Sequence, residues 1–216
     1  MERLRAILLR MRFALLFAIA SLMIAPVWAE DTPASVQGQA SASASTSIPV
    51  AQESPAEKRA KKLDRLLGQL HSAPIHSDTA RIEAEIWEIW SRNDSPTAEV
   101  LLRQSSAAIS ARDFEPAERM LAQLLETYPD YAEGWNRRAS LYYLMKRYDA
   151  AMIDIDHALA LEPRNFGALV GKGMILRATG KSYDAIAAFN EALAINPNLL
   201  AVKAAIAQIE KDEPKI

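Results

Sequence analysis

Residues 132–165 read AEGWNRRASLYYLMKRYDAAMIDIDHALALEPRN, and the pattern of apolar and small residues in this stretch returns before it and after it. Proline recurs at a step of 34 residues at Pro129, Pro163 and Pro197. Alanine recurs at the same step at Ala117, Ala151 and Ala185. A fixed period between about 20 and 50 residues indicates a repeat protein.

Each unit is expected to form two antiparallel helices. Apolar residues at offsets of 3, 4 and 7 make one stripe along a helix, and the small residues let the paired helices approach closely. A single unit cannot bury its own apolar face, whereas stacked neighbours can. The sequence therefore predicts an all-α fold, a solenoid of antiparallel helix pairs with three repeats at 98–131, 132–165 and 166–199.

The middle unit shows which kind of repeat this is. Its fourth, eighth, eleventh, twentieth, twenty-fourth, twenty-seventh and thirty-second positions hold Trp135, Ala139, Tyr142, Ala151, Ile155, Ala158 and Pro163. In these positions it resembles the tetratricopeptide repeat (TPR) family, and the chain resembles small exported TPR proteins of Gram-negative bacteria. One departure recurs, since the seventh position, usually Leu in the family, holds Gln104, Arg138 and Lys172.

Further helices are expected at both ends of the array. Residues 54–97 begin with the capping sequence Ser54-Pro55-Ala56-Glu57 and contain two amphipathic segments. We expect these segments to form a helical hairpin over the N-terminal end of the array, with Trp87 against the first repeat; a degenerate repeat is the alternative. Residues 200–212 predict a C-terminal capping helix.

The first 29 residues predict a signal peptide. Four arginines precede an apolar run at residues 13–25, and Val27-Trp28-Ala29 places small side chains where a signal peptidase reads them. We expect cleavage after Ala29 and a periplasmic protein; an uncleaved inner-membrane anchor is the alternative. Residues 30–53 are rich in Ser, Ala, Gln and Pro, a composition typical of a disordered linker.

Composition excludes several functional classes. The first 29 residues hold four of the 25 basic and one of the 27 acidic residues, so the remainder carries 21 against 26, a formal charge of −5. A nucleic-acid-binding domain is expected to be basic, so no nucleic-acid partner is predicted. The chain has no Cys, which rules out disulfides, thiolate metal sites and a thiol nucleophile.

No group of residues predicts catalysis, a cofactor or a metal. His71, His76 and His157 each have an acid–base or metal-binding interpretation, but a solvated histidine explains each more simply. Phosphate-binding glycine loops, Gly-flanked nucleophilic serines and His-Glu metal motifs are absent from the sequence. Membrane contact is expected only through an uncleaved N-terminus or the basic helix at 55–71.

The resemblance implies a partner-binding surface. TPR proteins bind an extended peptide or a partner helix on the concave face, which is lined by the first helix of each unit. Transferring the family's groove positions gives Leu102, Ser106, Asn136, Ser140, Tyr143, Val170, Met174 and Arg177. The family's clamp for a C-terminal carboxylate needs Lys and Asn at the fifth and ninth positions, and no unit here has that pair. An apolar strip with a few polar anchors favours an amphipathic segment.

These features predict a non-enzymatic scaffold or adaptor that binds a peptide or helix of a cell-envelope protein. A membrane-tethered structural spacer is one alternative. An enzyme that acts on the cell wall through paired carboxylates is a weaker one. Self-association of the repeats also stays open.

Overall fold

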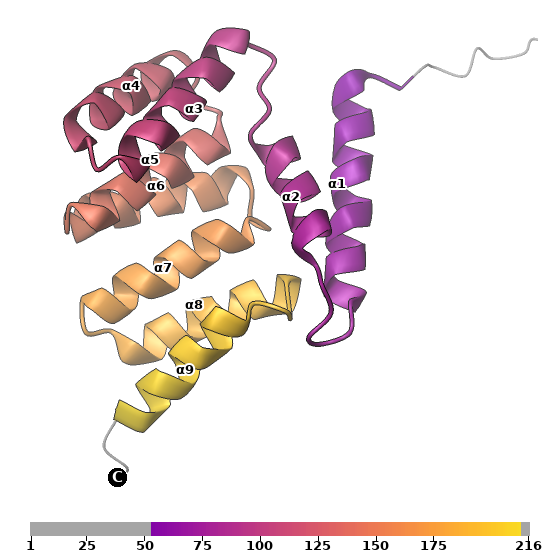
Figure 1. The fold of residues 1–216 in the computed structure, drawn as a ribbon, viewed down its shortest axis with the longest axis vertical. Helices are drawn as coiled ribbons and strands as arrows, with labels where there is room; N and C mark the ends of the chain where they lie inside the picture. The colour runs from indigo at the N-terminus through magenta and orange to yellow at the C-terminus, as the bar shows by residue number, and fades with distance from the viewer. Residues whose placement is uncertain (1–52, 213–216) are drawn as a thin grey trace, which may run out of the picture. The chain divides into compact units, whose positions relative to one another are not determined.

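A computed structural model describes residues 53–212, and all the regular secondary structure in that range is α-helical. Three helix pairs form the repeat array shown in Figure 1. They are α3 (Pro96–Ser110) with α4 (Phe114–Thr127), α5 (Ala132–Leu144) with α6 (Tyr148–Leu161), and α7 (Phe166–Ala178) with α8 (Ser182–Ile195). The predicted all-α solenoid of helix pairs is confirmed.

The recurring alanines lie where the two helices of a pair meet. Ala117, Ala151 and Ala185 are all 0% exposed. Because a methyl group is small, the helix backbones can approach closely there, and larger neighbours such as Leu121 and Phe189 fill the rest of the core. This packing explains why alanine, rather than any apolar residue, recurs at the step of the repeat.

Each pair turns from its first to its second helix in the same way. Arg112, Lys146 and Gly180 adopt the left-handed conformation, with φ values of 59°, 58° and 77°. In the first turn the amide of Asp113 donates to the carbonyl of Ala108, five residues back, which satisfies a carbonyl at the end of the helix. The apolar pattern of the sequence did not reveal this turn.

The two N-terminal helices, α1 (Pro55–Ser72) and α2 (Ala80–Trp90), form a hairpin along one edge of the array (Figure 1). Its apolar face joins one core cluster with Phe166, Leu169 and Ala192 of the third repeat. Trp87 packs edge-on to Phe166, with ring centroids 5.6 Å apart. The expected placement of Trp87 against the first repeat is therefore wrong, and the hairpin does not simply cover the N-terminal end.

Polar contacts also join the hairpin to the far end of the array. The ring of His71 forms a 2.8 Å hydrogen bond with the carbonyl of Ala194, between α1 and α8. The amide group of Asn196 donates to Glu83 of α2 at 3.1 Å. Arg164, in the turn before α7, donates to Asp64 of α1 at 2.6 Å. His71 and His157, two of the histidines discussed above, therefore both make contacts within the chain. His71 contacts α8, and the ring of His157 stacks on the ring of Trp135.

The last helix, α9 (Leu200–Asp212), packs on the third repeat. Its buried residues Val202 and Ile209 share a core cluster with Leu176 and Phe189. The predicted signal peptide and residues 30–52 of the predicted linker lie outside the described residues. Within residues 53–212, no helix combines the length and apolar character needed to span a membrane.

Candidate functional site

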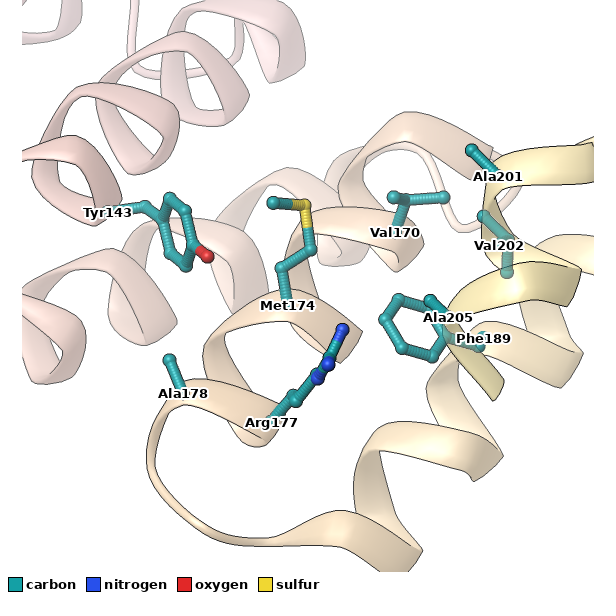
Figure 2. A pocket seen from close by; sticks show the side chains of 9 residues that line it. All are labelled: Tyr143, Val170, Met174, Arg177, Ala178, Phe189, Ala201, Val202 and Ala205. Carbon is teal, nitrogen blue, oxygen red and sulfur yellow. The ribbon is translucent and has the colours of Figure 1, made fainter. Parts of the chain in front are cut away.

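A hollow opens between α7 and α9, with one side chain from α5 at its edge. It has a volume of about 450 Å³. Figure 2 shows Tyr143 at one side, Val170, Met174 and Arg177 along α7, and the small side chains of α9 opposite. Arg177 reaches toward the space between Met174 and Phe189 (Figure 2).

A second hollow lies next to the first, between α5 and α7. Its volume is about 220 Å³, and it shares Tyr143 and Met174 with the first. The two hollows therefore form one surface, which we call the outer groove. Its wall residues from α5 and α7 include Ser140, Tyr143, Leu144, Val170, Met174 and Arg177.

Helical spacing brings these side chains to one face. Val170, Met174 and Arg177 are separated by four and three residues, which places them on one stripe of α7. The side-chain oxygen of Asn165 accepts from the amide of Ala168 at 3.0 Å and caps the start of that helix. Tyr143 on α5 lies against the ring of Tyr148, with centroids 5.7 Å apart.

Large apolar side chains in the outer groove are open to solvent. Leu144 is 51% exposed and Met174 is 41% exposed. Methionine adapts its shape readily, which suits a surface that accommodates a partner. Neighbouring exposed apolar side chains around a hollow are a common feature of interaction sites.

Five of the eight residues expected to bind a partner come together in the outer groove: Ser140, Tyr143, Val170, Met174 and Arg177. The other three line neither hollow. Leu102 is 5% exposed and belongs to the core of the first repeat. Ser106 donates its hydroxyl to the carbonyl of Leu102 at 2.8 Å. Asn136 is 7% exposed and its amide donates to Glu133 at 2.9 Å, so its side chain is largely buried within the chain.

The N-terminal ends of α5 and α7 form a different environment, which we call the inner groove and define by Glu133, Asn136 and Gly167. Glu133 is 1% exposed and accepts from Arg137 at 2.5 Å. Trp87 of α2 lies over Gly167, where an added Cβ would stand only 2.4 Å from the tryptophan ring. Trp87 therefore covers the N-terminal end of α7, and Glu133 and Asn136 at the start of α5 are buried by contacts within the chain.

The segment that follows α2 is also fixed to the array. Tyr131 directly precedes α5, and its hydroxyl donates a hydrogen bond to the carbonyl of Ser91 at 2.5 Å. The pKa of Tyr131 is raised above its usual value, first because the phenol is buried and then because Glu133 and Glu99 are negative. The neutral phenol is thus the form that suits this position.

Arg138 accounts for one of the unusual seventh positions. It donates two hydrogen bonds to Asp154 of α6, at 2.7 and 2.8 Å, and its guanidinium lies 4.8 Å from the ring centroid of Trp135. These hydrogen bonds raise the pKa of Arg138. Lys172 pairs with Asp156 at 3.7 Å, so both cations bind an acid on the second helix of the middle repeat.

Two parts of this arrangement were not anticipated. The wall formed by Ala201 and Ala205 of α9 was predicted only as a capping helix. The filled inner groove was not predicted at all, although the glycine at position 167 was a signal, since a residue without a side chain leaves room for a large neighbour. Among residues 53–212, no three His, Cys, Asp or Glu side chains converge as a metal site would require.

Sequence comparison finds relatives along most of the described chain. Family models described as tetratricopeptide repeat match residues 99–131, 132–165 and 154–199. A TPR repeat-containing protein of Rhizobium etli is 34% identical over 154 residues, which cover 71% of this chain and 76% of that protein.

Solved structures share the arrangement of helices. The first TPR domain of Spaghetti (RPAP3), bound to an HSP90 peptide, superposes with a TM-score of 0.53 at 22% identity, over 55% of this chain and 94% of that one. The TPR2B domain of yeast Sti1, in a complex with pHsp70, gives 0.51 at 17% identity, over 55% and 100% of the two chains. At these identities the likeness concerns the fold.

Proposed function

The chain belongs to the tetratricopeptide repeat family, and on that premise we propose that it is a protein-interaction module which binds a segment of a partner protein in the outer groove. The observation that supports this proposal most directly is the exposure of Leu144 and Met174 beside two connected hollows. An exposed apolar surface of this kind is stabilised when a partner's apolar side chains cover it.

The relatives support a protein or peptide as the partner. Of two domains with a similar fold, one is bound to an HSP90 peptide and the other forms a complex with pHsp70. This chain lacks the Lys and Asn pair of the family's carboxylate clamp, and its inner groove holds Trp87. The partner segment is therefore proposed to bind in the outer groove alone, with no role for a free C-terminal carboxylate.

We do not propose a catalytic role. The outer groove has one charged side chain, Arg177, among its lining residues, and general acid–base chemistry needs a group that gives or takes a proton near neutral pH. Arginine stays protonated in that range. A scaffold or adaptor without a cofactor fits these residues better than an enzyme does.

The proposed location is the periplasm, and it rests on residues 1–29 alone. N-terminal sequencing of the protein from fractionated cells tests it: a mature chain starting at Glu30 in the periplasmic fraction is the expected result. Retention of Met1 in a salt-resistant membrane fraction would instead favour the tethered spacer.

The binding proposal is tested with the mature chain (residues 30–216) as bait in a cell-envelope extract of the native host. Met174→Lys places a charge in the outer groove and is expected to abolish capture of the partner. Arg119→Glu is the control, because Arg119 is exposed on α4 and its ion pair within residues 53–212 is with Glu115 of its own helix. Equal capture by Met174→Lys and the parent chain would refute the outer groove as the site.

A further inference from the structure

We infer that the outer groove binds a single amphipathic helix whose two large apolar anchors stand about two turns apart and whose flanking side chain is acidic. The inference rests on the proposed function and adds the chemistry of the partner. It follows from the boundaries of the outer groove, the spacing of its hollows, its few polar atoms and its one charge.

The chain's own α2 fixes one boundary. Trp87 occupies the space over Gly167, and Trp90 lies 5.2 Å from Phe166 between ring centroids. A partner therefore cannot continue from the outer groove along the N-terminal end of α7. Helix α9 forms the opposite wall with Ala201 and Ala205.

The two hollows set the spacing of the anchors. One lies between α5 and α7 and the other between α7 and α9, with Met174 between them. Neighbouring helices pack with their axes about 8–10 Å apart. Two turns of helix advance about 11 Å, so side chains at i and i+7 match this step. Three residues of extended chain advance about 10 Å, and spacing alone does not separate the two forms.

The polar atoms of the outer groove distinguish a helical partner from an extended one. Its lining side chains offer polar groups only at Ser140, Tyr143 and Arg177, and the hydroxyl of Ser140 already donates to the carbonyl of Asn136 at 3.0 Å. An extended segment would bring amide and carbonyl groups onto this apolar surface without partners, which costs free energy. A helix satisfies its own backbone groups, so the surface favours a helix.

The charge indicates which helix. Arg177 is the one charged residue among those that line the two hollows, and none of them is acidic. Arg177 is exposed and forms no ion pair within residues 53–212. A carboxylate on the partner, next to the anchor that enters the hollow between α7 and α9, would complement this guanidinium.

Selection from a phage-displayed library of random 16-residue peptides tests the inference without knowledge of the natural partner. The parent chain (residues 30–216) is expected to enrich peptides with large apolar residues at i and i+7 and Asp or Glu beside one of them. Arg177→Glu is expected to shift this preference to Lys or Arg, whereas Arg119→Glu leaves it unchanged. Circular dichroism verifies that each variant is folded.

The selected peptides are then measured one by one by fluorescence anisotropy. Arg177→Ala is expected to weaken binding about three- to fivefold, as for an exposed ion pair, and the loss is expected to shrink at high salt. Enrichment of proline-containing or basic peptides, no enrichment, or a charge preference unchanged in Arg177→Glu would each overturn the inference.

Met174→Lys separates this inference from the proposed function. If it abolishes binding while the selected peptides lack an acidic preference, the outer groove is the site but the partner's chemistry is wrong. If the selected peptides bind Met174→Lys as well as the parent chain, they do not use the outer groove, and both the inference and the proposed site fail.

Discussion

Arg138 lies at a position where the family usually has Leu, and its contacts show how a cation fits there. Its side chain is 18% exposed and that of Asp154 only 2% exposed. The guanidinium meets the carboxylate with two parallel hydrogen bonds and also lies near the rings of Trp135 and Tyr142. Arg138 thus contacts both helices of the middle repeat.

Removing one member of this pair is expected to be costly. Asp154→Ala leaves the guanidinium without its acid and is expected to lower the free energy of unfolding by about 3 kcal/mol. Replacing both residues, as in Arg138→Met with Asp154→Leu, is expected to stay within about 1 kcal/mol of the parent chain, because no unpaired charge remains. Urea unfolding measures both. Equal losses of unfolding free energy in the single and the double variant would contradict the ion pair between Arg138 and Asp154.

Tyr131 makes the stability sensitive to alkaline pH. Its pKa is raised in the folded chain, first by burial, so the folded state holds the phenol proton more tightly than the unfolded state does. The contribution of the protonated Tyr131 phenol to stability is therefore fully present below about pH 10, the usual pKa of tyrosine. This contribution is lost as the pH rises through the pKa of the folded state.

Tyr131→Phe isolates this effect. At neutral pH the variant loses the hydrogen bond to Ser91 and is expected to be about 1 kcal/mol less stable. Between about pH 10 and 11 the parent chain is expected to lose stability faster, by up to about 1.4 kcal/mol per pH unit. Urea unfolding along a pH series gives both curves, and parallel curves would show that the phenol is not responsible.

At the scale of the helices, two glycines predict opposite effects of one added methyl group. An alanine Cβ at Gly173 of α7 would lie 2.4 Å from the ring of Phe189, whereas at Gly68 of α1 it would meet nothing within 4 Å. Gly68→Ala is expected to stabilise the chain by about 0.5–1 kcal/mol through helix propensity. Gly173→Ala is expected to destabilise it by about 1–3 kcal/mol through overpacking. Thermal unfolding followed by circular dichroism compares the two variants. A gain of stability in both would contradict the close approach of Gly173 to Phe189.

The placement of α2 on the third repeat predicts a coupling between distant parts of the sequence. The double-mutant cycle of Trp87→Ala and Phe166→Ala is expected to give an interaction energy of about 0.5–1.5 kcal/mol, as for an edge-on aromatic pair. Trp87→Ala with Leu121→Ala, in the core of the first repeat, is the control and is expected to be additive. Coupling to Leu121 but not to Phe166 would place α2 elsewhere.

The repeats were predictable from sequence because each apolar position recurs with the step of the helix pair. The order of the helices and the burial of residues such as Ala151 follow from that periodicity. The docking of α1 and α2 was not predictable in the same way. An apolar stripe such as Leu63, Leu66, Leu67 and Leu70 shows that a face is buried but not which surface covers it.

For the whole molecule, the hairpin joins the beginning of the described chain to its last repeat. In an open solenoid each unit contacts only its neighbours, whereas here α1 contacts α8. The same docking places Trp87 over Gly167 at the N-terminal end of α7, whereas the outer groove stays open. The sequence predicted the residues of α7 that line the outer groove. It also predicted Asn136 as a partner-binding residue, and the structure buries that side chain beside Glu133.

The outer groove as the binding site is tested most directly by photo-crosslinking in living cells of the native host. A photoreactive amino acid is placed at Met174, or at Arg119 as the control on α4, in the full chain. A discrete protein adduct from position 174 and none from position 119 is the predicted result. The same adduct from both positions, or an adduct from position 119 alone, would contradict the account.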